Sequence, residues 1–215
     1  MSEPWNRAVT MMGMKVDMTG ERKTQPGVWI AFEGVDGCGK STQAALLAER
    51  LGAVLTREPG NTDVGAAIRN VLLHQVVAMH DRCEVLLFAA DRAEHIEKVV
   101  KPVLAAGGIV VSDRSVWSSA IYQGIGRGVG VEEVLAVNDW ASDGVLPDIV
   151  VYLRRRATGA VANPDRIEAA GEEFYAKVEA GFETWAMAED WIIVDAGGIE
   201  ELAEKIAREV KARMW

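Results

Sequence analysis

The stretch from Val28 to Leu51 limits what this chain can fold into more than any other part of the sequence. Its first residues, Val28 to Phe32, are an apolar run rich in β-branched and aromatic side chains, which is typical of a buried strand. The next residues, Gly34 to Ser41, read GVDGCGKS and fit the phosphate-loop pattern G-x-x-x-x-G-K-[ST]. Ser41 to Leu51 then has helical character without Gly or Pro. A strand, a glycine-rich loop and a helix in this order predict an α/β fold.

The loop also has the composition of a phosphate-binding site. Its glycines let the backbone curl so that several N–H groups point at one centre, and the following helix adds the positive end of its dipole. Lys40 can reach the β- and γ-phosphates of ATP, and the Ser41 hydroxyl can coordinate Mg2+. The alternative is a glycine-rich turn that binds nothing, and the flanking strand and helix argue against it. The predicted ATP phosphate-binding residues are Gly34, Val35, Asp36, Gly37, Cys38, Gly39, Lys40, Ser41 and Thr42.

Composition and charge exclude several other classes of function. A chain of 215 residues with 49% hydrophobic and 26% charged residues can form one globular α/β domain with a sizeable core. Its net charge of -9 argues against binding a nucleic-acid polymer, which needs a basic face. No apolar run approaches the roughly 20 residues of a membrane span. The two cysteines have no metal-site spacing, and we expect a reducing, cytoplasmic location.

Apolar strands and helical patterns alternate along the rest of the chain. We expect further strands at 53–56, 108–112, 148–153 and 191–194, and helices at 63–74, 81–101, 115–124, 131–142, 167–188 and 199–214. This alternation predicts a three-layer α/β fold with a parallel five-stranded sheet and helices on both faces. Residues 1–27 are expected to be an N-terminal extension of the domain 28–215, either a mobile arm or a partner-binding segment.

Charged residues recur where the expected strands end. These residues are Arg57, Asp113, Arg114 and Arg154 to Arg156. Because ligands of parallel sheets bind beyond the carboxyl ends of the strands, we expect these residues and the phosphate loop to line one phosphate-rich cleft. Each arginine could instead be a solvated loop residue. Asp113 is expected to hold Mg2+ directly or through water, together with Ser41. The three histidines lie in no recognisable constellation and receive no role. The predicted catalytic residues are Lys40, Asp36, Arg57, Asp113, Arg114, Arg154, Arg155 and Arg156.

A second anion site is expected opposite the first. Phe88 and Arg92 are one helical turn apart and share a face, so they could stack a base and hold a phosphate. Alternatively, Phe88 could be a core residue and Arg92 could pair with neighbouring acids. With Arg57 and Arg114, this layout suits the transfer of a phosphoryl group between two bound nucleotides. Such a transfer needs positioning and charge neutralisation rather than a side-chain nucleophile.

Taken together, these motifs resemble the thymidylate kinase family. The resemblance covers about residues 28–214 and rests on FEGVDGCGKST, TREPGNT, LFAADR, SDRS with SSAIYQGIGRG, PDIVVYL and DRIE. It implies a P-loop NTPase fold, transfer of the ATP γ-phosphate to dTMP with Mg2+, the products dTDP and ADP, and a homodimer packed through long helices. The dTMP-binding residues that it implies are Asp36, Glu58, Phe88, Arg92, Arg114, Ser119, Tyr122 and Gln123.

Three departures from the family pattern concern the donor side. Arg154 stands where the family usually has an acidic residue, Asn61 stands where it usually has Gly, and the lid at about 154–165 is short. Since the phosphate loop has no arginine, a transition-state arginine should come from Arg154, Arg155, Arg156 or Arg166. Two alternatives to a dTMP kinase are a kinase for dUMP or a 5-substituted dUMP with the same fold, and a non-catalytic ATP-binding switch, which the short lid motivates.

Overall fold

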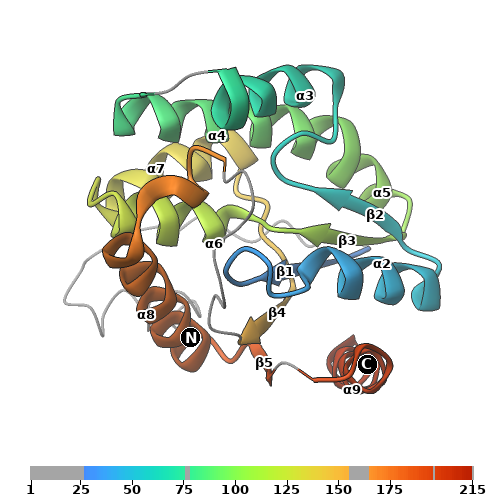
Figure 1. Cartoon of the computed structure of the whole chain (residues 1–215). Coiled ribbons are helices and arrows are strands. Elements are labelled where there is room, and N and C mark those ends of the chain that lie inside the picture. The colour runs from blue at the N-terminus through green and yellow to red at the C-terminus, as the bar shows by residue number, and fades with distance from the viewer. Residues whose placement is uncertain (1–26, 76–77, 155–164, 196, 215) are drawn as a thin grey trace.

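Five parallel strands form the centre of the molecule (Figure 1), as the sequence predicts. In the computed structural model, which describes residues 27–75, 78–154, 165–195 and 197–214, the order across the sheet is β2-β3-β1-β4-β5. Every neighbouring pair runs parallel. The strands are β1 Val28–Glu33, β2 Val54–Arg57, β3 Ile109–Asp113, β4 Ile149–Arg154 and β5 Ile192–Asp195.

Helices connect the strands, as parallel pairing requires. The α-helices are α2 Lys40–Leu51, α3 Asp63–Asn70, α4 Asp81–His95, α5 Lys101–Ala105, α6 Val116–Ser119, α7 Val131–Ser142, α8 Glu172–Ala188 and α9 Ile199–Met214. Wider π-helical segments continue three of them, and one 3-10 segment precedes α8. These are η1 Val71–Gln75, η2 Ile96–Val100, η3 Ala120–Gly126 and η4 Glu168–Ala170.

The helices cover both faces of the sheet. Helices α2 and α9 pack against each other on one face, where α2 contacts β3 and α9 contacts β4 and β5 (Figure 1). Helix α5 contacts β3, and α8 contacts β4. Helices α4 and α7 pack side by side. The alternating side chains of β1 serve both faces: Trp29 packs with Ile96 and Leu104, whereas Ile30 and Phe32 belong to the main core. This confirms the three-layer α/β fold.

Three predicted helix boundaries were wrong. The helix expected at 167–188 begins only at Glu172, because Gly171 has φ +92° and lies outside helical geometry. The helix expected at 115–124 continues as η3 to Gly126. The helix expected at 81–101 extends through η2 and α5 to Ala105.

Two predicted segments fall mainly outside the described residues. The N-terminal extension 1–27 is described only at Gly27, and the predicted lid at about 154–165 only at its two ends. None of the helices in the described part of the chain combines the length and apolar character that crossing a bilayer requires.

Candidate functional site

The phosphate loop leaves β1 between the two strands that flank it, β3 and β4, and runs into α2. This is the switch point of the sheet, where parallel α/β folds bind ligands. At Gly34 the loop passes so close to β4 that an added Cβ would lie 2.8 Å from the Leu153 carbonyl oxygen. Gly39 precedes α2 with φ +100°, which favours glycine. The glycines are therefore required by the path of the backbone.

Lys40 and Ser41 occupy the first turn of α2. The Lys40 side chain is buried, and its Nζ donates a hydrogen bond to the Val35 carbonyl at 2.7 Å. Burial, with the nearby charge of Arg114, lowers the pKa of Lys40. Ser41 Oγ lies 2.5 Å from Asp113 Oδ2 and donates a hydrogen bond to it, so two oxygens that could coordinate a metal ion lie next to each other.

These two oxygens fit Mg2+, which prefers oxygen ligands and usually keeps waters and substrate phosphates in its remaining positions. The described residues hold no group of three or more His, Cys, Asp or Glu side chains that could bind a metal without a substrate. Ser41 and Asp113 would thus supply two ligands of such an ion, and waters or substrate phosphates would supply the others.

Arg114 lies directly beyond β3 in the left-handed region, with φ +77°. This conformation is uncommon for a residue with a long side chain, and such residues concentrate at functional sites. Its Nη1 donates to the Gly34 carbonyl at 3.2 Å and to Ser118 Oγ at 2.8 Å, and its Nη2 donates to Asp36 Oδ1 at 2.5 Å. The side chain thus ties the phosphate loop to β3 and α6.

The Asp36 carboxylate receives several donors besides Arg114. The hydroxyls of Tyr122 and Tyr175 lie 3.0 and 3.4 Å from its Oδ2. Burial by itself would raise the pKa of Asp36, yet the charges of Arg114 and Lys40 outweigh it and lower the pKa to about 2. Asp36 is therefore an anchored anion at the centre of the site.

The buried carboxylate of Glu33 stabilises the position of Arg114 through a shared hydrogen-bond partner, Ser118. Glu33, at the end of β1, accepts hydrogen bonds from Ser115 Oγ at 2.7 Å and Ser118 Oγ at 2.6 Å. Burial raises the pKa of Glu33 despite these donors. Because Ser118 Oγ also accepts from Arg114, Glu33 fixes the hydroxyl that holds the guanidinium.

Arg92 is buried on α4, only 2% exposed, and its guanidinium is surrounded by partners. Its Nε donates to Glu58 Oε2 at 2.9 Å, Nη2 donates to Ser119 Oγ at 3.2 Å, and Nη1 donates to Asn138 Oδ1. Burial would raise the pKa of Glu58, but Arg92 and His95 lower it below its ordinary value. The pairing with an acid, which was the alternative for Arg92, is thus observed with Glu58, whereas the base contact stays a prediction.

His95 corrects the prediction that no histidine belongs to a constellation. Its Nδ1 lies 2.8 Å from Glu58 Oε1 and its Nε2 lies 2.7 Å from Thr56 Oγ1, all buried. Nearby, Asp91 Oδ1 accepts from the Gly60 N–H at 2.8 Å, while its buried Oδ2 has no hydrogen-bond partner among the described residues. Burial and the Glu58 charge raise the pKa of Asp91 to about 6.

Glu84 forms a third buried cluster at the start of α4. Its carboxylate, which is 0% exposed, accepts from Gln123 Nε2 at 2.8 Å, Arg127 Nε at 3.3 Å and Arg166 Nη1 at 2.5 Å. Arg166, one of the arginines expected to act from the lid, is thereby held on Glu84.

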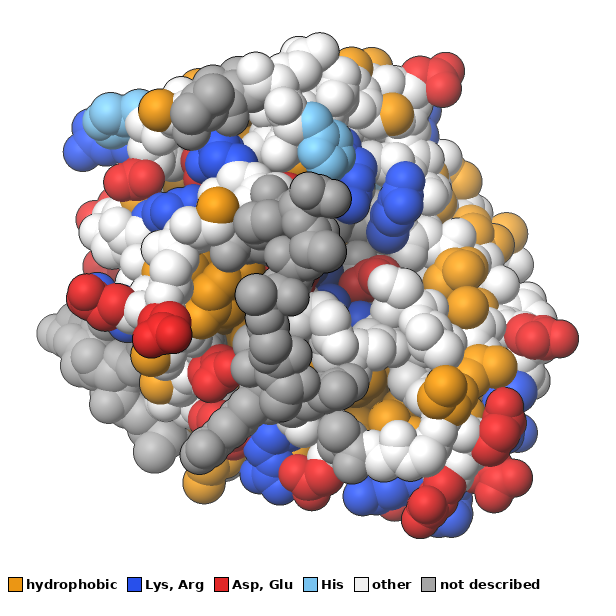
Figure 2. Space-filling view, in the orientation of Figure 1, with side chains coloured by type: hydrophobic (Ala, Val, Ile, Leu, Met, Phe, Trp, Pro, Cys, Tyr) orange, Lys and Arg blue, Asp and Glu red, His pale blue; other side chains and the backbone are white. Residues whose placement is uncertain are grey.

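One open cavity of about 640 Å3 brings most of the predicted residues together, which is a usual size for a small-molecule site. Arg57, Arg92, Arg114 and Lys40 line it jointly. Figure 2 shows acidic and basic side chains meeting in a hollow near the middle of this face. The other predicted residues in its lining are Asp36, Gly37, Gly39, Ser41, Thr42, Glu58, Phe88, Asp113, Ser119, Tyr122 and Gln123.

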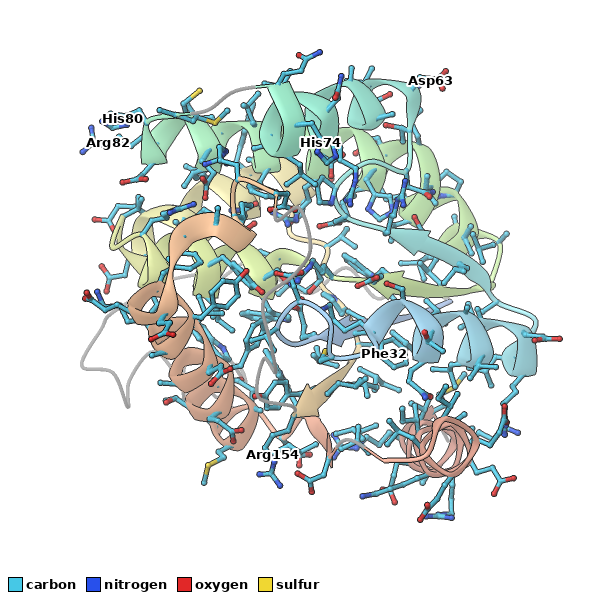
Figure 3. The ribbon with its side chains drawn as sticks, viewed as in Figure 1. Phe32, Asp63, His74, His80, Arg82 and Arg154 are labelled. Carbon is cyan, nitrogen blue, oxygen red and sulfur yellow. The ribbon has the colours of Figure 1, made fainter. Side chains whose placement is uncertain are left out.

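Other predicted residues lie elsewhere. The side chains of the phosphate-loop residues Val35 and Cys38 are buried in the main core. Arg154 is outside the cavity lining, and its Nε donates to Asp195 Oδ1 at 2.6 Å on β5. Figure 3 shows Arg154 turned outward at the end of β4. Arg155 and Arg156 lie outside the described residues.

Sequence reasoning missed several residues of the site. Arg69 on α3 lines the cavity and donates to the Pro59 carbonyl at 3.0 Å. Glu84, Phe88, Asp91 and His95 follow one another along α4 at intervals of three or four residues, so they share its inward face. Polar side chains on the buried face of a helix were the signal that could have found them.

Comparisons with known proteins identify the family of this chain. Residues 32–206 match the family model described as "Thymidylate kinase". Thymidylate kinase from Leifsonia xyli subsp. xyli is 42% identical over 203 residues, covering 88% of this chain and 95% of the relative. The enzyme of that name from Clavibacter sepedonicus is 43% identical over 201 residues, covering 87% and 94%. The crystal structure of thymidylate kinase from Ehrlichia chaffeensis aligns with a TM-score of 0.75 at 31% identity, covering 86% of this chain and 98% of that one.

Proposed function

Since this chain belongs to the thymidylate kinase family and phosphorylates dTMP, we propose that its cavity holds ATP with Mg2+ and dTMP head to head for direct phosphoryl transfer. The observation that carries this proposal is that the phosphate-loop Lys40 and three arginines from other elements, Arg57, Arg92 and Arg114, line a single cavity. In a chain of net charge -9, this concentration of cations fits two polyanionic ligands.

On the donor side, we assign the ATP phosphates to the backbone N–H groups of the phosphate loop and to Lys40. Lys40 Nζ rests on the Val35 carbonyl, from which it can turn to a bound phosphate without leaving its buried position. Ser41 and Asp113 would hold Mg2+. When bound, this ion neutralises charge on the phosphate oxygens.

On the acceptor side, we assign the dTMP phosphate to Arg57 and Arg114 and the thymine to Phe88, Arg92 and Gln123, all of which line the cavity. Asp36 acts through Arg114, since the 2.5 Å ion pair fixes the guanidinium beside the phosphate loop. The acceptor is thereby oriented in line with the donor, which supplies much of the rate enhancement in phosphoryl transfer.

The chemical step then needs no covalent intermediate on the protein. An oxygen of the dTMP phosphate bonds to the γ-phosphorus as the bond from that phosphorus to the β,γ-bridging oxygen breaks, and ADP leaves. Lys40 and Arg114 offset the charge that develops on the transferring group. Products are dTDP and ADP.

The test is a coupled assay of ADP release with dTMP, dUMP, dCMP and dGMP as acceptors. We expect dTMP to give the highest kcat/KM. A preference for dUMP would identify the related kinase, and ADP release that no monophosphate stimulates would identify an ATP-binding switch instead.

We also propose a cytoplasmic homodimer. Both cysteines are free thiols, which suits a reducing compartment. Leu86 on α4 and Trp140 on α7 are 59% and 85% exposed, and they project from two helices that pack side by side. Contiguous exposed apolar patches mark association surfaces, and we propose that these two side chains belong to one such patch. Sedimentation velocity measures the oligomeric state directly.

A further inference from the structure

The amide of Gln123 has its orientation set by a neighbour outside the cavity. Its Nε2 lies 2.8 Å from Glu84 Oε1, and Glu84 is also contacted by the guanidinium groups of Arg127 and Arg166. A carboxylate held by two guanidinium groups offers only acceptor oxygens, so it must receive the NH2 end of the amide. The opposite orientation would place two oxygens against each other.

This arrangement leaves the other end of the amide for the cavity. Gln123 is 1% exposed and lines the cavity, and no described residue donates a hydrogen bond to its Oε1. On the same wall, Arg92 carries only donors. A base that meets this wall therefore encounters a fixed acceptor from Gln123 next to the Arg92 guanidinium, in which one N–H of Nη1 has no acceptor among the described residues.

Pyrimidine bases differ in how they match that pattern. Thymine and uracil carry a carbonyl at position 4 and an N–H donor at position 3, which complement a donor and an acceptor respectively. Cytosine carries an amino group at position 4 and an unprotonated nitrogen at position 3, so both polarities are reversed. A buried site built for one pattern rejects the other strongly, because polar groups are left unpaired.

We propose that Glu84 is a positioning residue that fixes the Gln123 amide with its oxygen toward the base, and so makes the site select 4-oxo over 4-amino pyrimidine nucleotides. This inference rests on the proposed function, in which Gln123 contacts the base. Glu84 does not line the cavity and acts only through Gln123. Its burial matters, because in a dry environment the amide cannot exchange Glu84 for water.

The first test uses the wild-type protein and two acceptors that differ only at positions 3 and 4 of the base: dTMP and 5-methyl-dCMP. We expect kcat/KM for dTMP to exceed that for 5-methyl-dCMP by about 100-fold or more. Equal use of the two acceptors would overturn the inference. Failure to phosphorylate dTMP at all would instead refute the proposed function, so the two failures are distinguishable.

The second test is Glu84→Gln, which replaces the obligate acceptor by an amide that can face Gln123 with either end. The preference for dTMP over 5-methyl-dCMP should fall by about 10-fold or more, since one hydrogen bond no longer has a fixed polarity. General damage to the fold would lower both activities together and leave their ratio unchanged. A folded variant with the wild-type ratio would overturn the inference.

Glu97→Gln is the matched control, because it makes the same change at an exposed site on η2 and should leave the ratio unchanged. If Glu84→Gln does not fold, Glu84→Asp replaces it. This variant keeps the charge that Arg127 and Arg166 require but withdraws the carboxylate from Gln123 by about one methylene. A reduced preference for dTMP is again expected, and the wild-type ratio would again contradict the inference.

Discussion

The ion pair between Asp36 and Arg114 yields a prediction whose size follows from the structure. The two side chains are 29% and 15% exposed and meet at 2.5 Å. A pKa for Asp36 that falls from 3.8 to about 2 on folding corresponds to about 2 kcal/mol in favour of the ionised carboxylate. Asp36→Asn should therefore lower the free energy of unfolding by about 2 kcal/mol at pH 7.

The pH dependence has a definite sign. Because the pKa of Asp36 is lower in the folded protein, its stabilisation is fully present above pH 3.8 and is lost as the pH falls toward 2. The stability difference between wild type and Asp36→Asn should thus be constant from pH 7 to pH 5 and smaller at pH 3. Urea denaturation at these three pH values measures it.

Asp190→Asn is a suitable control for this experiment. Asp190 pairs with Arg213 at 3.4 Å, but its side chain is 94% exposed, and ion pairs at the surface contribute little. We expect a change below about 0.5 kcal/mol. The reasoning fails if Asp36→Asn is no less stable than Asp190→Asn at pH 7, or if its deficit is undiminished at pH 3.

Three further predictions concern single side chains. Lys40→Ala should lower kcat by about 100- to 1000-fold in steady-state assays, since it removes a main electrostatic group from the transition state, and unchanged turnover would contradict this role. The raised pKa of Asp91 makes its ionisation unfavourable in the folded protein, so the wild type should lose up to about 3 kcal/mol of stability as the pH rises from 4 through 6. Asp91→Asn should not show this loss. Urea titrations at pH 4.5 and 7.5 that show the same pH dependence in both proteins would refute the prediction. Arg154→Ala should change kcat less than threefold, because Arg154 is bound to Asp195 outside the cavity. A loss of kcat above about 30-fold would show that Arg154 takes part in catalysis.

Those features of the fold that depend on local pattern could be predicted from the sequence. The run Val28 to Phe32, the glycine-rich loop and the helix after it are contiguous, and their apolar periodicity and glycine spacing are sufficient to place them. Helices 131–142 and 199–214 were predicted with the observed ends. The boundaries that failed lie at π-helical segments and at Gly171, where the chain departs from the regular α-helical repeat.

Predictions for the site divide in a similar way. The strand-end residues Arg57, Asp113 and Arg114 could be predicted to meet, because parallel strands bring their carboxyl ends to one edge. Arg154 satisfies the same rule, but a partner on β5 holds it away from the cavity, and such partners are set by tertiary packing. Glu84 gave no strand-end signal, since it acts from within a helix.

Direct transfer between two bound nucleotides is the claim on which the proposed mechanism depends. It is tested by incubating the protein with Mg2+, dTMP and ATP that is labelled at the γ-phosphate, and then separating the products. We predict that the label appears in dTDP in a one-to-one ratio with the ADP formed. Label found in free phosphate or on the protein, with none in dTDP, would contradict the mechanism.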